Sequence, residues 1–209
     1  MPARSRSRAE RAPLILAVTG ASGAPYALKL LEELVRAQRT VWLLVSSHGW
    51  RLLATETDVP DAAALRRHIG AKSWDTYVRT FDDTDRGAAP ASGSTPTSGM
   101  IICPCSMGTV AAIAAGTSRS LIERAADVTV KERRPLILVP RETPLSDIHL
   151  ANLLRLSRAG AVVLPAAPGF YHRPQKIEDL VAFVVARVLD HAEVSHKVGR
   201  RWTGEAPNE

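Results

Sequence analysis

Residues 14–23 read LILAVTGASG. The first six form a continuous apolar run, which is typical of a strand buried on both faces of a sheet. Gly20 ends this run, and a helix is expected over residues 24–38, where apolar residues recur at helical spacing. A second apolar run covers residues 40–46. This alternation of strand, helix and strand predicts a parallel sheet with right-handed crossovers.

Later segments repeat the same scheme. Three short apolar runs end in proline, which cannot donate to a strand ladder and therefore fits the end of a strand. They are MIICP at 100–104, LILVP at 136–140 and AVVLP at 161–165. Further helices are expected through Trp50 and Leu53 and near residues 106–115, 120–132, 145–158 and 176–192. The chain is therefore predicted to be an α/β protein.

The composition fits one domain. The chain has 209 residues, of which 45% are hydrophobic, and this is ample for one core, expected over residues 13–193. No apolar run reaches the roughly 18 residues that span a bilayer, and no signal-peptide stretch follows the N-terminus. We therefore expect a cytoplasmic protein without a membrane span.

The positive charge is concentrated at the N-terminus. Residues 1–12 carry four arginines against Glu10, a net charge of +3, which is half of the total of +6. We expect this segment to be a disordered basic arm and residues 194–209 to be a C-terminal tail. Because the body shows no basic stripe interleaved with aromatic residues, nucleic-acid binding is not expected.

Cys103 and Cys105 are the only cysteines. Residues this close together are poorly placed to bridge each other, so no disulfide is expected. Two thiols are also too few for a structural zinc site. Both cysteines are expected to pack as small hydrophobic residues.

In open parallel sheets, ligands bind beyond the carboxyl ends of the strands, so the loops there are the candidate site. The first is Gly20-Ala21-Ser22-Gly23, whose small residues allow backbone N–H groups to approach a phosphate or a ring edge. The pattern lacks both GxGxxG and the P-loop lysine, and a turn that simply needs glycine is an equal alternative. Ser46-Ser47 follows the second strand, where capping of the next helix is the simpler interpretation.

Two further loops offer polar groups. Ser106, Gly108 and Thr109 bring hydroxyls and backbone donors to a helix start. Arg141-Glu142 follows the strand at 136–140, where an arginine can bind phosphate and a carboxylate can handle protons. The aromatic and basic loop 168–174 follows the last strand, and a surface loop with an anchoring aromatic residue is the alternative to a binding role.

The low-complexity stretch 82–98 is long enough to be either functional or mobile. It begins with Asp82-Asp83-Thr84-Asp85, which we interpret as solvated, since its spacing differs from that of the magnesium motifs of diphosphate prenyltransferases. Arg133 and Arg134 close a helix and are expected to be structural.

Seven strings occur in the order in which they stand in the UbiX/Pad1 family of flavin prenyltransferases. They are TGASGAPYA, ATETD, PASGS, CPCS, ERAADV, KERRPLILVPRETP and LPAAPGFYHRPQ. The chain resembles this family from about Leu14 to Asp190, and again at Arg201-Trp202. It departs from the pattern before PASGS, where some relatives carry tryptophan and this chain has Arg86 or a neighbour.

The resemblance implies a Rossmann-like (flavodoxin-like) three-layer fold with a parallel sheet, in a homo-oligomeric flavoprotein that is usually a dodecamer with active sites at subunit interfaces. It implies a metal-independent enzyme that joins dimethylallyl monophosphate to N5 and C6 of reduced FMN. The product, prenylated FMN, serves UbiD-type decarboxylases, as in ubiquinone biosynthesis.

The resemblance also assigns roles to residues. The implied FMN contacts are Gly20, Ala21, Ser22, Ser46, Ser106, Met107, Gly108, Thr109 and Arg141. The implied contacts to the prenyl phosphate are Lys131, Arg141, Tyr171 and Arg187. The implied catalytic residues are Ser22, Glu56, Glu142 and Lys131. Glu56 and Arg187 are raised only by the resemblance.

Two alternatives remain open. A flavin-dependent cysteine decarboxylase shares this fold and uses a histidine after the first helix, a region that contains His48 in this chain. The Met- and Asn-rich substrate clamp of that class is not found. A non-catalytic flavin carrier is the second alternative, and it would leave the cluster of Lys131, Arg141 and Arg187 without a purpose.

Overall fold

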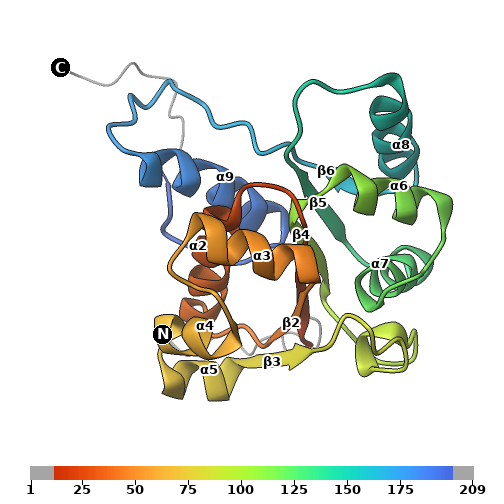
Figure 1. Cartoon of the computed structure of the whole chain (residues 1–209), viewed down its shortest axis with the longest axis horizontal. Coiled ribbons are helices and arrows are strands. Elements are labelled where there is room, and N and C mark those ends of the chain that lie inside the picture. Colours follow the sequence, from red (N-terminus) through yellow and green to blue (C-terminus); the bar gives the residue numbers. More distant parts are fainter. Residues whose placement is uncertain (1–11, 200–209) are drawn as a thin grey trace, which may run out of the picture.

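The computed structural model describes residues 12–199. Within these residues, six strands form one parallel sheet in the order β3-β2-β1-β4-β5-β6 (Figure 1). Their bounds are β1 Leu14–Val18, β2 Val41–Val45, β3 Val78–Phe81, β4 Gly99–Cys105, β5 Leu136–Pro140 and β6 Val162–Val163. The predicted α/β fold with a parallel sheet is confirmed.

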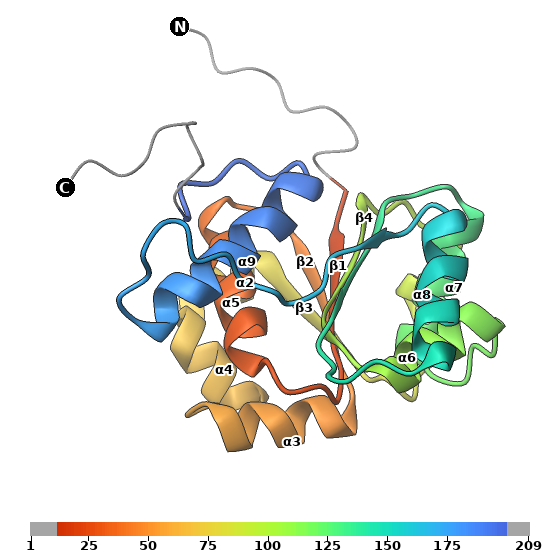
Figure 2. The ribbon, with the colours of Figure 1, turned by 90° about the horizontal axis from the view of Figure 1, so that it is seen from above.

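Helices cover both faces of the sheet and make a three-layer molecule (Figure 2). One side holds α2 (Ala24–Arg36), α3 (Ser47–Glu56), α4 (Ala62–Ile69), α5 (Ala71–Tyr77) and α9 (Ile177–His191). The other side holds α6 (Met107–Ala115), α7 (Leu121–Lys131), α8 (Asp147–Arg158) and the short 3₁₀ helix η1 (Ala89–Ala91). No helix among residues 12–199 is long and apolar enough to cross a membrane.

The alternation of side chains along β1 explains the two layers. Leu16 and Val18 belong to the apolar core on the α2 and α9 side, whereas Ile15 and Ala17 belong to the core on the α6 and α7 side. Because side chains of a strand point to opposite faces in turn, a strand covered on both sides must be apolar throughout. All five residues of β1 are buried, as the continuous apolar run predicts.

Four elements among the described residues were not expected from the sequence: α4, α5, β3 and the short η1. The strand β3 lies at the edge of the sheet, and its two central residues, Arg79 and Thr80, are exposed. An edge strand therefore lacks the apolar run by which the inner strands are recognised. At the other edge, β6 is shorter than the expected strand at 161–165. Pairing nevertheless continues past it, because the N–H of Leu164 donates to the Leu138 carbonyl at 2.8 Å.

Candidate functional site

A cavity of about 410 Å³ lies at the carboxyl ends of the strands. It opens between β1 and its neighbours β2 and β4. At this place the chain runs from β1 to α2 on one face of the sheet, and from β4 to α6 on the other face. Such a change of direction is where open parallel sheets bind ligands, and the volume is in the range of small-molecule sites. The lining residues are Thr19, Gly20, Ser46, Ser47, His48, Asp83, Ser106, Thr109, Ser120, Ile122 and Glu123.

Three helices begin at this cavity, each with a serine at its N-cap. Ser46 caps α3 by accepting from the N–H of Gly49 at 3.0 Å, and Ser106 caps α6 by accepting from the N–H of Thr109 at 3.2 Å. Ser120 caps α7. Free N–H groups and the positive end of the helix dipole favour an anion at such positions. The capping predicted for Ser46 is confirmed, while Ser120 was not recognised from the sequence.

Gly20 allows α3 to approach the end of β1. A Cβ atom at residue 20 would lie 2.6 Å from the Cβ of His48, a distance that real Cβ atoms essentially never show. The glycine is therefore required by packing. This packing agrees with the alternative of a turn that simply needs glycine, and the approach of backbone N–H groups to a phosphate or a ring edge stays a prediction.

Thr19 joins the loops that follow β1 and β4. Its side chain is almost fully buried, and its hydroxyl donates to the Pro104 carbonyl at 3.0 Å and accepts from the N–H of Ser106 at 2.8 Å. The hydroxyls of Ser106 and Thr109 lie 2.9 Å apart. Thr19 is thus a positioning group for the Ser106 loop, hidden from sequence inspection because it reads as the end of an apolar run.

Ser22, Glu56 and Arg141 form one hydrogen-bonded cluster beside the cavity. The Glu56 carboxylate accepts from the N–H groups of Gly23 and Ala24, both at 2.8 Å, and so caps α2, whose own N-cap Gly23 has no side chain. The Ser22 hydroxyl also bonds to Glu56. The Nε of Arg141 donates to the Ser22 carbonyl at 2.9 Å. A hydroxyl, a carboxylate and a guanidinium therefore converge on the first loop.

The pKa of Glu56 lies below its ordinary value. Burial raises this pKa, but the hydrogen bonds from Gly23, Ser22 and Ala24 and the charge of Arg141 lower it by more. The group is therefore an ionised acceptor at neutral pH. A carboxylate that already accepts the Ser22 hydroxyl is placed to receive a proton through it.

The stretch 82–98 is tied down at both ends. The Asp83 carboxylate accepts from the N–H of Ile122 at 2.8 Å, and its carbonyl accepts from the N–H of Leu121 at 2.7 Å. The Arg134 guanidinium donates to the carbonyls of Gly93 and Thr95. The interpretation of Asp83 as solvated was wrong, because its carboxylate caps α7 and lines the cavity. Arg134 is structural, as expected.

Asp83 and Glu123 place two carboxylates in a cavity that otherwise suits an anion. Both carboxylates already accept hydrogen bonds. Asp83 accepts from the N–H of Ile122 at 2.8 Å, and Glu123 accepts from the Arg119 N–H at 2.7 Å and the Thr117 hydroxyl at 2.9 Å. Burial raises the pKa of Glu123, but the bonds from Arg119 and Thr117 lower it by more. The charges of these groups are thus directed into the protein rather than toward a ligand.

The remaining residues of the expected flavin set lie near the cavity without lining it. Ala21 is buried, and the side chain of Met107 is packed in the core on the α6 side. Gly108 is exposed in the first turn of α6. Ala21 and Met107 therefore have only backbone groups to offer a ligand.

The expected contacts to the prenyl phosphate are not brought together within one chain. Lys131 ends α7 before β5 begins, pairs with Glu132, and lies against Gly93, whereas Arg141 follows the far end of β5. Arg187 lies near the end of α9, on the opposite face of the sheet from α7 (Figure 2). The end of α9 packs near Leu14, at the amino ends of the strands.

Tyr171 and Glu142 are exposed loop residues. The Tyr171 ring meets Phe183 of α9 edge-on at 5.7 Å, so the aromatic residue does anchor its loop. Glu142 lies beside Arg141, and one of its oxygens accepts from the N–H of Thr143 at 3.1 Å. Arg86 is also exposed. Arg201, Trp202 and all but the last residue of the basic arm lie outside the described residues.

Both cysteines are fully buried in β4. Burial raises the pKa of the Cys103 thiol to about 12, and burial together with Cys103 raises that of Cys105 further. The thiolate that a redox or nucleophilic role requires is therefore disfavoured. In residues 12–199, no group of three His, Cys, Asp or Glu side chains is arranged to hold a metal ion.

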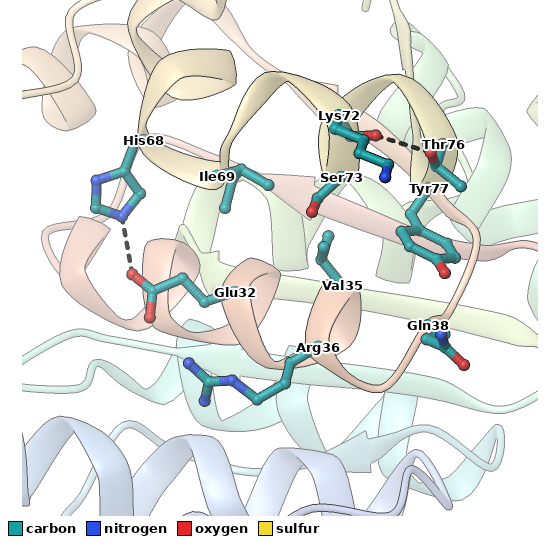
Figure 3. A pocket seen from close by; sticks show the side chains of 10 residues that line it. All are labelled: Glu32, Val35, Arg36, Gln38, His68, Ile69, Lys72, Ser73, Thr76 and Tyr77. Carbon is teal, nitrogen blue, oxygen red and sulfur yellow. Dashed lines mark hydrogen bonds and ion pairs between the residues drawn. The ribbon is translucent and has the colours of Figure 1, made fainter.

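A larger hollow, of about 790 Å³, lies between α2 and the α4–α5 pair (Figure 3). Nε2 of His68 and Oε1 of Glu32 form a hydrogen bond across it at 2.8 Å. It contains none of the expected site residues and lies away from the carboxyl ends of the inner strands. Size alone therefore does not identify the functional site of this protein.

Comparisons with known proteins identify the family of this chain. The flavoprotein family matches residues 2–189. Flavin prenyltransferase UbiX of Pseudomonas aeruginosa is 53% identical over 196 residues, which cover 90% of this chain and 93% of the relative. Flavin prenyltransferase UbiX of Synechocystis is 45% identical, with 92% of this chain and 96% of the relative covered.

Solved structures give the same result. A crystal structure of AnUbiX (PadA1) in complex with FMN and dimethylallyl pyrophosphate has a TM-score of 0.85 and 41% identity, and covers 93% of this chain and 99% of that one. A dodecameric FMN-dependent UbiX-like decarboxylase of Escherichia coli O157:H7 has a TM-score of 0.84 and 41% identity, and covers 92% and 100%. The chain belongs to the UbiX flavin prenyltransferases of the flavoprotein family.

Proposed function

We propose that this chain is a flavin prenyltransferase that joins the dimethylallyl group of dimethylallyl monophosphate to N5 and C6 of reduced FMN. The observation that carries the proposal is the cluster of Ser22, Glu56 and Arg141 beside a cavity lined by capped helix N-termini. This cluster joins a proton acceptor to a cation for a phosphate. The relatives named flavin prenyltransferases support the same activity.

The cavity fits the phosphate end of FMN. Hydroxyls of Ser46, Ser106 and Thr109 face a space at which three helices begin. We assign the flavin contacts to these groups, to the backbone of the Gly20 loop and of residues 107–108, and to Arg141. The flavin ring then extends toward Ser22 and Arg141.

Reduced FMN supplies N5 and C6 as the atoms that form the new bonds to carbon. The residues of this chain stabilise negative charge, accept protons and exclude water. Lys131, Arg141 and Arg187 stabilise the negative charge that develops on the leaving phosphate when the allylic C–O bond breaks, a role that needs no metal. Ser22, with Glu56 behind it, and Glu142 are placed to handle the two protons lost from N5 and C6. One of these protons is returned to the middle carbon of the allyl group, whose double bond is consumed by the bond to C6, and the other leaves with the phosphate. A site closed to water protects the reactive allyl group.

The donor site requires more than one copy of the chain, because Lys131 and Arg187 lie on opposite faces of the sheet. Large apolar side chains are exposed on and before α8, next to the Arg141 loop; Ile148 is 72% exposed and Leu154 51%. Such a surface is typical of an interface between copies. A dodecamer, as in the Escherichia coli neighbour, is the assembly that we propose.

Residues 13–193 act as the flavin-binding domain in this proposal. The product passes in the cytoplasm to a UbiD-type decarboxylase.

The test is anaerobic incubation of the purified protein with reduced FMN and dimethylallyl monophosphate, followed by mass spectrometry of the released flavin. A flavin heavier by one five-carbon unit is expected. A cysteine decarboxylase or a flavin carrier would return FMN of unchanged mass. That result, obtained with protein that binds FMN, would contradict the proposal.

A further inference from the structure

Arg187 is the first member of a chain of hydrogen bonds that ends in the C-terminal tail. Its NH1 group donates to Oδ2 of Asp190 at 3.0 Å. The other carboxylate oxygen, Oδ1 of Asp190, lies 3.1 Å from Nε2 of His196. Asp190 thus joins the exposed Arg187 of α9 to His196, which lies six residues beyond Asp190 in the chain.

The tautomer of His196 follows from its second contact. The backbone N–H of Val198 donates to Nδ1 at 3.2 Å, so Nδ1 acts as an acceptor and Nε2 carries the proton that is donated to Asp190. The exposed fraction rises along the series, from 4% for the His196 side chain to 22% for Asp190 and 51% for Arg187. The network is therefore fixed in the protein at one end and reaches solvent at the other.

The tail that carries His196 is itself held against α9. Val194 is buried in the core, and its N–H donates to the Leu189 carbonyl at 3.0 Å. Gly199, with φ +74°, passes so close to α9 that a Cβ atom there would lie 3.0 Å from the Cβ of Ala186. The tail thus folds back along the helix to the residue that precedes Arg187.

We propose that Asp190 and His196 are positioning residues that aim the Arg187 guanidinium at the phosphate of the prenyl donor; this rests on the proposed function. An exposed ion pair between Arg187 and Asp190 would by itself be worth little, because both side chains would stay mobile. The bond from buried His196 fixes the orientation of the carboxylate. Ordering the arginine before the donor binds lowers the entropy lost on binding. The remaining N–H groups of the guanidinium can still donate to a phosphate.

Two substitutions at His196 separate positioning from simple packing. His196→Gln can place a donor where Nε2 stands, but gives up the acceptor for Val198. His196→Asn can keep an acceptor near Nδ1, but is too short to donate to Asp190. We expect His196→Asn and Asp190→Ala to raise KM for dimethylallyl monophosphate about tenfold, as the loss of a charge-assisted hydrogen bond would. His196→Gln should stay close to wild type, and kcat should change little in all three.

The controls make the possible outcomes distinct. FMN affinity, measured by fluorescence titration, should be unchanged in every variant, and His191→Gln, an exposed histidine on the same helix, should behave like wild type. Equal donor KM values for His196→Asn, Asp190→Ala and the wild type would overturn the positioning role. So would equal losses in His196→Asn and His196→Gln, since only packing would then matter. A wild-type protein that forms no prenylated flavin would instead overturn the proposed function.

Discussion

The two halves of the proposed site are built in different ways. The flavin half lies within one chain, where the ends of β1, β2 and β4 bring the Gly20 loop and three capped helices to one cavity. The donor half does not, because Lys131 and Arg187 lie on opposite faces of the sheet and away from Arg141. Parallel strands gather their carboxyl ends within one chain. The ends of α7 and α9 lie instead toward the amino ends of the strands, on opposite faces of the sheet. We therefore expect flavin binding to be a property of the fold, and donor binding a property of the assembly.

The largest effect is expected from Gly20→Ala, which changes the flavin half of the site. The new methyl group would collide with His48 and move the loop or α3. Displacements of this size cost about 100-fold or more in function, so FMN affinity and turnover should both fall by at least that factor. Fluorescence titration and product analysis measure the two losses. Gly87→Ala is the control, since its methyl group would meet only an Asp85 oxygen at 3.4 Å. Normal FMN binding by Gly20→Ala would show that the close approach is not needed.

Glu142→Gln should separate chemistry from binding. The side chain is exposed beside Arg141 and is not among the residues that line the cavity in the part of the chain that the structure describes. FMN affinity should therefore stay unchanged, while product formation slows about 100-fold, the lower range for loss of a general base. Single-turnover measurements with saturating FMN report this rate. Wild-type turnover in the variant would remove Glu142 from the mechanism.

A smaller effect, on stability, is expected from Glu56→Gln. The amide keeps the shape but loses the charge that accepts from Gly23 and Ala24, at a cost of about 1 kcal/mol in the free energy of unfolding at pH 7. Because the folded-state pKa is lowered, the contribution of Glu56 is fully present above the ordinary pKa of glutamate, near 4.5, and is lost as pH falls through the folded value. Urea unfolding measures this effect. The difference in the free energy of unfolding between variant and wild type should be smaller below pH 4 than at pH 7. A difference that does not depend on pH would contradict the interpretation that the ionised Glu56 carboxylate caps α2.

The sequence predicted the inner strands well, because burial on both faces demands an unbroken apolar run. It also predicted the loops at their carboxyl ends. It did not predict β3, α4 and α5, which are short and partly exposed, or the roles of Thr19, Asp83 and Ser120. Those roles arise from contacts between distant segments: Thr19 meets Pro104 and Ser106, and Asp83 meets the start of α7. Such contacts leave no local pattern in the sequence.

Mixing two inactive variants tests most directly whether the donor half is shared between copies. Lys131→Ala and Arg187→Ala should each bind FMN normally and each lose most donor-dependent turnover. If the two cations of one site come from different copies, then mixed assemblies, formed by co-expression of the two variants, contain some sites with both cations intact and should regain a clear fraction of wild-type activity. Co-expressed variants that show no more activity than either variant alone would contradict a donor site built between chains.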